Sequence, residues 1–248
     1  MPLSDLIEKS KISQEQYRAA KRKLAIMCRI VGLQGHIDLF GHISIRIPNT
    51  DIVLITPGAG DEKTTVRADD IFTFDLDGNI HYHPGGDHPL YIPMEWRIHT
   101  QIHRDRPELG CVAHLHAHAS TLLGIADKKI EPVHSRGALF ENVPVWDNPR
   151  LVVRDEQAVS LSKSLGKEIA CQMRGHGSVV VGETAETTLA AIQFLEENCQ
   201  WQLEAAALGG ARPLSAEEIR DCSHGRLDFG PRLWEFWERR ALRSGLPL

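Results

Sequence analysis

The chain has 248 residues, 42% of them hydrophobic and 25% charged, with a formal net charge of −5 at pH 7. This composition is typical of a globular protein with a full core, and the acidic balance excludes the basic surface that binding to nucleic acid requires. The five cysteines form no C-x-x-C pair, no apolar run reaches the roughly 18 residues of a membrane span, and the opening MPLSDLIEKS has no signal-peptide core. We therefore expect a cytoplasmic protein with reduced cysteines, no membrane association and no nucleic-acid partner.

The first predicted element is a long amphipathic helix. Residues 1–12 are polar and are interpreted as an N-terminal arm. Ser13 and Gln16 have the spacing of a capping box, and apolar residues then recur every three or four positions up to Val31, just before Gly32. This pattern predicts a helix of about five turns that ends at the glycine.

A strand with one polar face is predicted next. Isoleucines alternate with polar residues over 42–47, so one face belongs to the core, while the face that could line a pocket carries His42, Ser44 and Arg46. A second strand over 51–56 ends at the glycine-rich turn 57–60. The backbone N–H groups around Gly58 either approach an anion or simply turn the chain, and the residues alone leave both interpretations open.

The following hairpin and helix carry several histidines. Asp77-Gly78 is a strong two-residue turn signal and predicts a hairpin over 71–82. We interpret the histidines at its end, His81, His83 and His88, as hairpin and loop residues, because a metal site needs a rigid scaffold. A helix is predicted from Pro93 to just before Pro107, and three residues four apart share one of its faces: Glu95, His99 and His103.

The segment 111–118 has the strongest chemical signal in the chain. Its apolar residues predict a buried strand, in which His114 and His116 point to the same face and form half of a metal site. A candidate third ligand is His176, which stands between two glycines immediately before an apolar strand. His118, the next histidine of the run, is either a neighbour of the ligands or a core residue.

Two further helices complete the main body. The pattern predicts one over 157–169 and a longer one that has Thr184 as its N-cap and ends at Gly209-Gly210. We assign 13–210 to one domain and 211–248 to a helical tail. The aromatic residues of the tail require burial, against the body or against a neighbouring subunit.

Several motifs follow one another in a specific order. They are G-H-x-S-x-R, T-P-G, an E-W at a helix start, R-P-E-L-G-C-V-A-H-L-H, and R-G-H-G before a V-V-V-G strand. Each is weak alone, but the ordered set resembles the class II aldolase/adducin family over roughly residues 18–210, so 13–210 would be its catalytic domain. The resemblance implies an α/β fold in three α/β/α layers with a central, largely antiparallel sheet, and a homotetramer with sites at subunit interfaces.

The resemblance also implies roles for individual residues. One divalent metal ion (Zn, Mn, Fe or Co) would be held by His114, His116 and His176, and Glu95 would be the catalytic acid/base. His134 lies near the position where sugar aldolases place a tyrosine acid from a neighbouring subunit, which makes it the second catalytic candidate. The adducin branch has lost the metal site, so the presence of all three histidines and the glutamate favours an enzyme.

Departures from the family pattern bear on the substrate. Members that act on sugar phosphates carry G-N-x-S-x-R, T-P-T-G and a Ser-Ser pair before the glutamate, and these groups bind the phosphate. Here the Asn is replaced by His42, the turn reads T-P-G-A-G, and the pair is Pro93-Met94. Two hydroxyl donors are therefore gone, which disfavours a phosphorylated sugar. The predicted substrate-binding groups, suited to a carboxylate or a phenolic oxygen, are His42, Ser44, Arg46, Gly58 and Arg136.

This pattern resembles the branch of the family that decarboxylates hydroxy-aromatic acids, such as pyridine-dicarboxylate and dihydroxyphthalate decarboxylases. The prediction is a metal-dependent carbon–carbon lyase of aromatic compound catabolism, acting on a small carboxylic acid. Two alternatives remain: an aldolase or epimerase for a small sugar or sugar acid, and a non-catalytic adducin-like scaffold.

Overall fold

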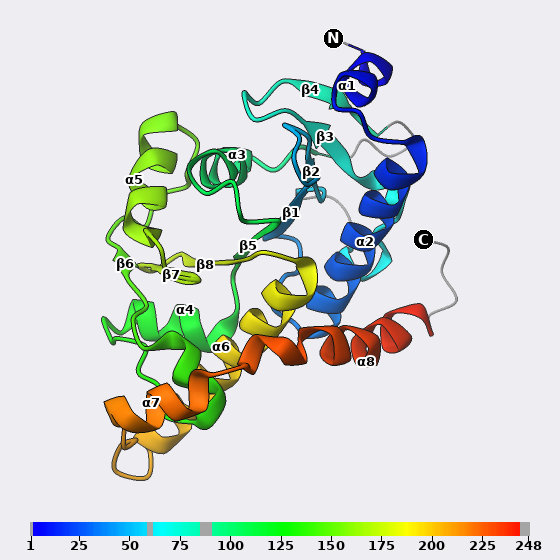
Figure 1. Cartoon of the computed structure of the whole chain (residues 1–248). Helices are drawn as coiled ribbons and strands as arrows, with labels where there is room; N and C mark the ends of the chain where they lie inside the picture. Colours follow the sequence, from blue (N-terminus) through cyan, green and yellow to red (C-terminus); the bar gives the residue numbers. More distant parts are fainter. Residues whose placement is uncertain (1, 59–61, 85–90, 244–248) are drawn as a thin grey trace.

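The computed structural model describes residues 2–58, 62–84 and 91–243 (Figure 1). The α-helices are α1 (Leu3–Lys9), α2 (Gln14–Leu33), α3 (Trp96–Asp105), α4 (His118–Ile125), α5 (Asp155–Leu165), α6 (Ala185–Ala206), α7 (Ala216–Ser223) and α8 (Gly230–Leu242). Short 3-10 helices are η1 (Lys63–Thr65), η2 (Ala68–Asp70), η3 (Ser135–Phe140) and η4 (Arg226–Phe229). The strands are β1 (His42–Arg46), β2 (Val53–Ile55), β3 (Phe72–Phe74), β4 (Ile80–Tyr82), β5 (Cys111–Leu115), β6 (Val145–Trp146), β7 (Ala170–Met173) and β8 (Gly177–Gly182). Within these described residues, no helix combines the length and the apolar character needed to cross a bilayer.

The strands form one sheet in the order β4-β3-β2-β1-β5-β8-β7-β6. Neighbours run antiparallel except β6 and β7, which are parallel. The sheet is therefore mixed and mainly antiparallel. At its centre β5 lies between β1 and β8, and its His114 is paired with His42 on one side and with Val179 on the other. This register brings polar side chains of two strands together.

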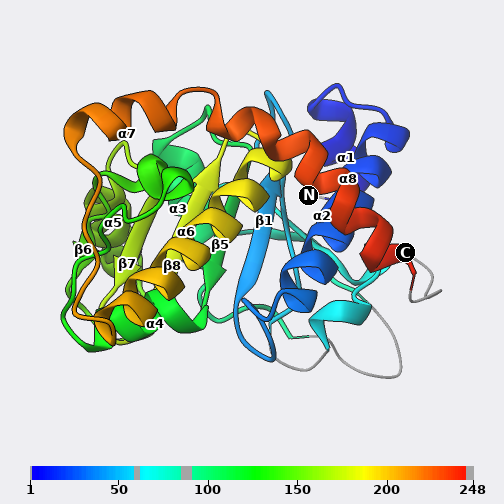
Figure 2. The same cartoon turned by 90° about the horizontal axis from the view of Figure 1, so that it is seen from below.

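Helices cover both faces of the sheet (Figures 1 and 2). On one face α2, α6 and α8 pack together, and the apolar cluster beneath them includes Met27 and Leu189, both fully buried. On the other face lie α3 and α5, whose Ile98 and Leu161 pack in a second cluster with Val112 of β5. The central strands β1, β5 and β8 are thus buried on both sides, and their polar side chains meet water mainly at the strand ends.

The helix starts predicted at Ser13 and Thr184 are confirmed. The Ser13 side chain accepts a hydrogen bond from the Gln16 backbone N–H at 3.1 Å, and the Gln16 side chain accepts one from the Ser13 N–H at 2.8 Å. At the start of α6, the Thr187 N–H donates to Thr184 Oγ1 at 3.1 Å. Both capping boxes satisfy N–H groups that have no partner within the helix.

Several elements differ from the prediction, among them α3, which was predicted to begin at Pro93 and begins at Trp96. β5 ends at Leu115, so His116 lies just beyond the strand and not within it. The helix predicted over 157–169 spans Asp155–Leu165, and the residues after it form β7, which was not predicted. The segment A-C-Q-M contains no β-branched residue, so its strand conformation is determined by pairing with β8, which a local pattern does not contain.

The two ends of the chain pack on the body. Residues 1–12, the predicted N-terminal arm, contain α1, whose Leu6 and Ile7 are buried in the cluster under α2. In the tail, Trp234 is buried and the Trp237 indole N–H donates to Gln193 of α6 at 2.9 Å. The division of the chain at residue 210 stays a prediction.

Candidate metal centre

Three histidines and one glutamate meet at the end of β5. His114 belongs to β5, His116 follows its last residue, and Glu95 immediately precedes α3. His176 lies in the tight turn between β7 and β8. Because β8 runs antiparallel to β5 with Ser178 opposite Leu115, this turn places His176 beside His116.

The four side chains are close enough to share one ion. Their ligand atoms all lie within 4.8 Å of one another. Nε2 of His114 is 3.0 Å from Nε2 of His116 and 3.4 Å from Oε2 of Glu95, and Nε2 of His176 is 3.6 Å from the same oxygen. Two nitrogens that each lie about 2.0–2.1 Å from one zinc ion are about 3 Å apart, so the spacing fits a shared divalent ion.

The hydrogen bonds around the histidines also fit a metal ion. Nδ1 of His114 lies 3.2 Å from the Ser178 carbonyl oxygen, so Nδ1 donates and Nε2 presents its lone pair to the group. Both ring nitrogens of His176 are buried without a hydrogen-bond partner among the described residues. An unsatisfied buried polar group costs roughly 1–3 kcal/mol, and an ion at Nε2 would satisfy it. Nitrogen and oxygen donors of this kind bind Zn, Mn, Fe or Co and do not select one of them.

The protonation states of Glu95 and His116 favour the binding of a metal cation. Burial raises the pKa of Glu95, but its interactions with His114 and His176 and the Val152 backbone N–H outweigh burial and hold the pKa of this carboxyl well below its usual range. The Val152 N–H donates to Oε1 at 2.8 Å, which leaves Oε2 facing the histidines. Burial, with His114 and His176 nearby, lowers the pKa of His116 to about 4. At neutral pH the group therefore contains an ionised carboxylate and an unprotonated His116.

A pocket of about 400 Å³ opens beside this group. Its polar side chains are His42, Glu95 and His116, and its other side chains are mostly apolar: Phe40, Tyr91, Ile92, Pro93, Met94 and Leu151. Gly58 lies in the wall, where its N–H donates to the Tyr91 carbonyl at 2.8 Å and an added Cβ would lie 2.9 Å from Pro93 Cα. The pocket thus has apolar walls and a metal-ligating, acid/base group at one end.

Comparison with known proteins identifies the family. The model of the Class II Aldolase and Adducin N-terminal domain matches residues 22–203. The chain belongs to the class II aldolase and adducin family. Class II aldolases use a divalent metal ion, and in this member the group of Glu95 and three histidines is able to bind one.

Relatives of different kinds share this family. The chain is 27% identical to 3,4-dihydroxyphthalate decarboxylase of Terrabacter sp. (strain DBF63), over 92% of this chain and 98% of that protein. Gamma-adducin of Homo sapiens is also 27% identical, over 74% of this chain and 27% of that protein. Among solved structures, L-fuculose 1-phosphate aldolase from Glaciozyma antarctica PI12 has a TM-score of 0.79 at 20% identity and covers 92% of this chain and 90% of its own. This likeness confirms the class II aldolase fold.

Two predicted substrate contacts lie behind the pocket of this class II aldolase homologue. Ser44 is fully buried, with its hydroxyl between His99 and His103. Arg46 donates from Nε to the Thr50 carbonyl and from Nη1 to the His103 carbonyl. Both share a strand face with His42, as predicted, but each step of two residues moves about 6–7 Å along a strand. Their positions do not support direct substrate contact, whereas His42 and Gly58 do line the pocket.

Two histidines beside the site, His99 and His103, have no role predicted from the sequence. His99 and His103 are fully buried on α3, and Nε2 of His99 lies 2.6 Å from Nδ1 of His42. The available signal was their spacing of four, which puts both on the face of α3 that points to the sheet. The apolar wall at 91–94 was also missed, because no periodic pattern marks a pocket lining.

His134 and Arg136 lie elsewhere on the subunit. The His134 ring packs edge-on against Trp201 of α6 with ring centroids 4.2 Å apart, and Arg136 pairs with Glu197 at 2.9 Å. Neither belongs to the metal-ligating group or to the lining of the pocket described above. Their predicted roles depend on a neighbouring subunit and stay predictions.

The remaining histidines of interest do not join the group. Nε2 of His81 lies 2.9 Å from Asp75 Oδ2, and Nδ1 of His83 lies 2.9 Å from the Pro84 carbonyl, so both support the hairpin and its loop. His118 is the first residue of α4 and is exposed, which excludes a core role. His88 lies outside the described residues.

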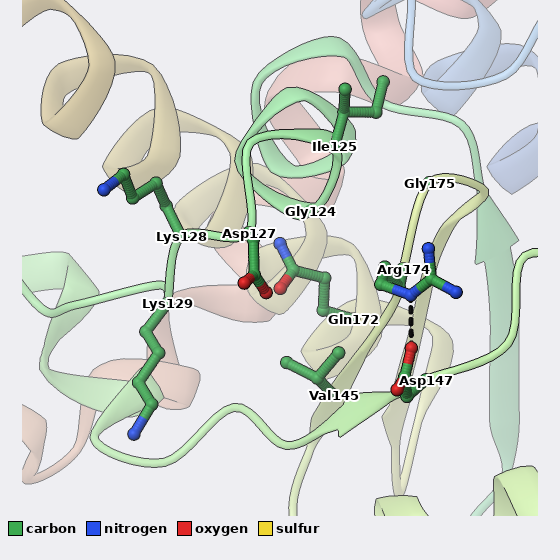
Figure 3. A pocket seen from close by; sticks show the side chains of 10 residues that line it. All are labelled: Gly124, Ile125, Asp127, Lys128, Lys129, Val145, Asp147, Gln172, Arg174 and Gly175. Atoms are coloured by element: carbon green, nitrogen blue, oxygen red, sulfur yellow. Dashed lines mark hydrogen bonds and ion pairs between the residues drawn. The ribbon is translucent and has the colours of Figure 1, made fainter.

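A larger hollow of about 900 Å³ lies beside β6 and β7 (Figure 3). Its charged side chains are those of Asp127, Lys128, Lys129, Asp147 and Arg174, and Arg174 is ion-paired with Asp147. Gly175 borders it, but none of the four metal-ligating side chains does. Because chemistry requires those side chains, we place the candidate active site in the smaller pocket.

Zinc should stabilise the fold through this centre. A ligand present at 100 times its dissociation constant raises the free energy of unfolding by about 2.7 kcal/mol. For a protein of this size, that corresponds to a rise in Tm of roughly 5–10 °C. Thermal unfolding with and without Zn²⁺ would measure the shift, which we expect His116→Ala to remove. The matched control is His118→Ala, which truncates an exposed histidine and should retain the shift. An equal shift in both variants would place the zinc elsewhere.

Proposed function

We propose that this protein is a divalent-metal-dependent carbon–carbon lyase that decarboxylates a hydroxy-aromatic carboxylic acid. The observation that carries the proposal is the pocket wall formed by Tyr91, Ile92, Pro93 and Met94 next to Glu95. Sugar-phosphate members of the family carry a Ser-Ser pair in place of Pro93-Met94. An apolar wall favours an aromatic ring, because burial of apolar surface contributes about 25 cal/mol per Å².

Glu95 and water together can account for every proton that moves in this reaction. A divalent ion held by His114, His116 and His176 would stabilise the negative charge that develops on a ring oxygen as carbon dioxide leaves. Glu95 is ionised at rest, so it first accepts the proton of the substrate hydroxyl. Glu95 then gives this proton to the ring carbon that bears the carboxylate, the carbon–carbon bond breaks, its electron pair moves through the ring to the ring oxygen, and that oxygen takes a proton from water.

The relatives give this proposal independent support. The Terrabacter relative, whose name specifies decarboxylation of 3,4-dihydroxyphthalate, aligns over nearly its whole length. At 27% identity it supports the reaction class and leaves the substrate open. The adducin-like scaffold is less well supported, because this chain retains all four residues of the metal-ligating group.

We further propose a homo-oligomer, with a tetramer as the predicted form. His134 and Arg136 lie outside the pocket of their own subunit, so in this arrangement they would reach the pocket of a neighbour. His134 would then act as a second proton donor and Arg136 as a substrate ligand. A cytoplasmic location is proposed as well, in keeping with five free cysteines.

The decisive test is carbon dioxide release from a panel of ortho-hydroxy aromatic acids, with Zn²⁺, Mn²⁺, Co²⁺ or Fe²⁺ added in turn. We expect metal-dependent release that is lost in His114→Ala. A sugar-phosphate panel assayed for aldehyde serves as the parallel arm. Aldehyde formation without carbon dioxide would contradict the proposal and favour an aldolase, and inactivity in both arms despite bound metal would favour a scaffold.

A further inference from the structure

A chain of hydrogen bonds runs from the pocket into the protein interior. Nδ1 of His42 lies 2.6 Å from Nε2 of His99, and Nδ1 of His99 lies 2.7 Å from Ser44 Oγ. The same hydroxyl lies 2.9 Å from Nε2 of His103, whose Nδ1 lies 3.2 Å from the Leu109 carbonyl oxygen. All four side chains are buried, and only His42 lines the pocket.

The last bond of this series, from His103 to the Leu109 carbonyl, determines the direction of every other hydrogen bond in it. A carbonyl oxygen can only accept, so His103 carries its proton on Nδ1 and, as a neutral ring, accepts at Nε2. The Ser44 hydroxyl must then donate to His103, and it accepts from Nδ1 of His99. His99 therefore accepts at Nε2 from Nδ1 of His42. Each of the three rings has its proton on Nδ1, and the lone pair of His42 Nε2 is left over.

These bond directions hold when all three imidazoles are neutral, and their buried surroundings favour the neutral form. Burial lowers the pKa of His103 to about 3. Burial also holds the pKa of His99 well below its ordinary value, with His103 and His114 adding to the effect. His42 is buried, its ring lies against that of His114 with centroids 5.1 Å apart, and a cation held by His114 would repel a second proton on His42.

We propose that this series of hydrogen bonds makes His42 a specificity-determining residue, which accepts a hydrogen bond at Nε2 from an O–H or N–H group of the substrate. The proposal rests on the proposed function only in taking the pocket as the substrate site. His99, Ser44 and His103 are positioning residues that act through His42. Among the described residues Nε2 has no hydrogen-bond partner, so it is available to a donor group of the substrate.

This assignment narrows the substrate class. A carboxylate oxygen can only accept, so placing it against the lone pair of a neutral His42 leaves two acceptors facing each other. The carboxylate of the substrate therefore binds away from His42, and a hydroxyl lies next to it. From the sequence, His42 could bind either a carboxylate or a phenolic oxygen, and the direction of the hydrogen bonds selects a protonated hydroxyl.

The tautomers can be measured without any activity. In the full-length protein with ¹⁵N-labelled histidines, loaded with diamagnetic Zn²⁺, NMR distinguishes protonated from unprotonated ring nitrogens. We expect His42, His99 and His103 all to carry the proton on Nδ1. A proton on Nε2 of His42, or a doubly protonated ring in the chain at neutral pH, would overturn the proposal.

Recognition is tested with two variants and two ligands. His99→Gln keeps an acceptor, its amide oxygen, for Nδ1 of His42, whereas His99→Leu keeps none. 2,3-Dihydroxybenzoate retains one O–H after its carboxylate and adjacent hydroxyl have bound a metal ion, and phthalate has no O–H at neutral pH. By calorimetry on zinc-loaded protein, we expect His99→Leu to weaken dihydroxybenzoate binding about tenfold and His99→Gln to restore most of it, with little change for phthalate.

The outcomes separate this inference from the proposed function. Equal weakening of both ligands in His99→Leu would indicate a packing role, and failure of dihydroxybenzoate to bind the wild-type protein would exclude the recognition step; both contradict the inference. If His99→Leu does not fold, the wild-type tautomers decide alone. Absence of decarboxylation would reject the proposed function and leave the tautomer result standing.

Discussion

Replacing Glu95 with Gln should lower turnover by roughly 10²–10⁴-fold while the protein keeps its metal ion. The amide cannot accept a proton from the substrate hydroxyl and return it to carbon. Its carbonyl oxygen can still accept the hydrogen bond that the Val152 N–H now donates to Oε1 at 2.8 Å, so the loop stays in place. The three histidines still offer three nitrogens for the ion.

The measurement is carbon dioxide release together with bound metal per subunit. Glu196→Gln is the matched control, because Glu196 is also buried and also accepts backbone N–H groups, at the start of α4. We expect that control to keep full turnover. Loss of metal along with activity in Glu95→Gln would mean that Glu95 is a ligand in the resting protein. Unchanged turnover would move the proton transfer to another residue.

The sequence predicted the ligands better than it predicted their surroundings. The spacing of His114 and His116 and the glycines beside His176 are local features, and the structure places all three imidazoles together. The bond between Glu95 and Val152 joins residues 57 positions apart, and no periodicity contains such a contact. The match of the Class II Aldolase and Adducin N-terminal domain over residues 22–203 confirms the family resemblance that supplied the glutamate.

The strand that carries His42, Ser44 and Arg46 also shows that a local pattern does not contain tertiary contacts. Alternation predicted their common face correctly, but only the position along the strand decides which side chain reaches the pocket. Ser44 instead faces the α3 histidines, which are brought to it by packing of α3 on the sheet. The depth of a side chain and the partners around it are tertiary properties, so the alternation could not tell that only His42 of the three lines the pocket, and the substrate contacts of Ser44 and Arg46 stay predictions.

Gly177→Ala should damage both the fold and the metal centre. An added Cβ would lie 2.2 Å from the Leu115 carbonyl oxygen and 3.0 Å from Cδ2 of His116. The carbonyl belongs to β5, where Leu115 is paired with Ser178, so it cannot retreat without opening the sheet beside His114. We expect a loss of about 3 kcal/mol in the free energy of unfolding and a metal affinity at least about tenfold weaker.

Gly182→Ala tests whether the metal effect is specific. Gly182 ends the same strand, and its added Cβ would meet Thr188 Oγ1 at 2.6 Å and Thr187 Oγ1 at 2.8 Å, away from the histidines. Urea unfolding should show a loss of roughly 1–3 kcal/mol in this variant too, whereas zinc titration should give nearly wild-type affinity. If both variants lost affinity equally, the metal centre would depend on the stability of the whole sheet. A loss confined to Gly177→Ala would show that the close approach of β8 to the end of β5 holds His116 in its ligating position.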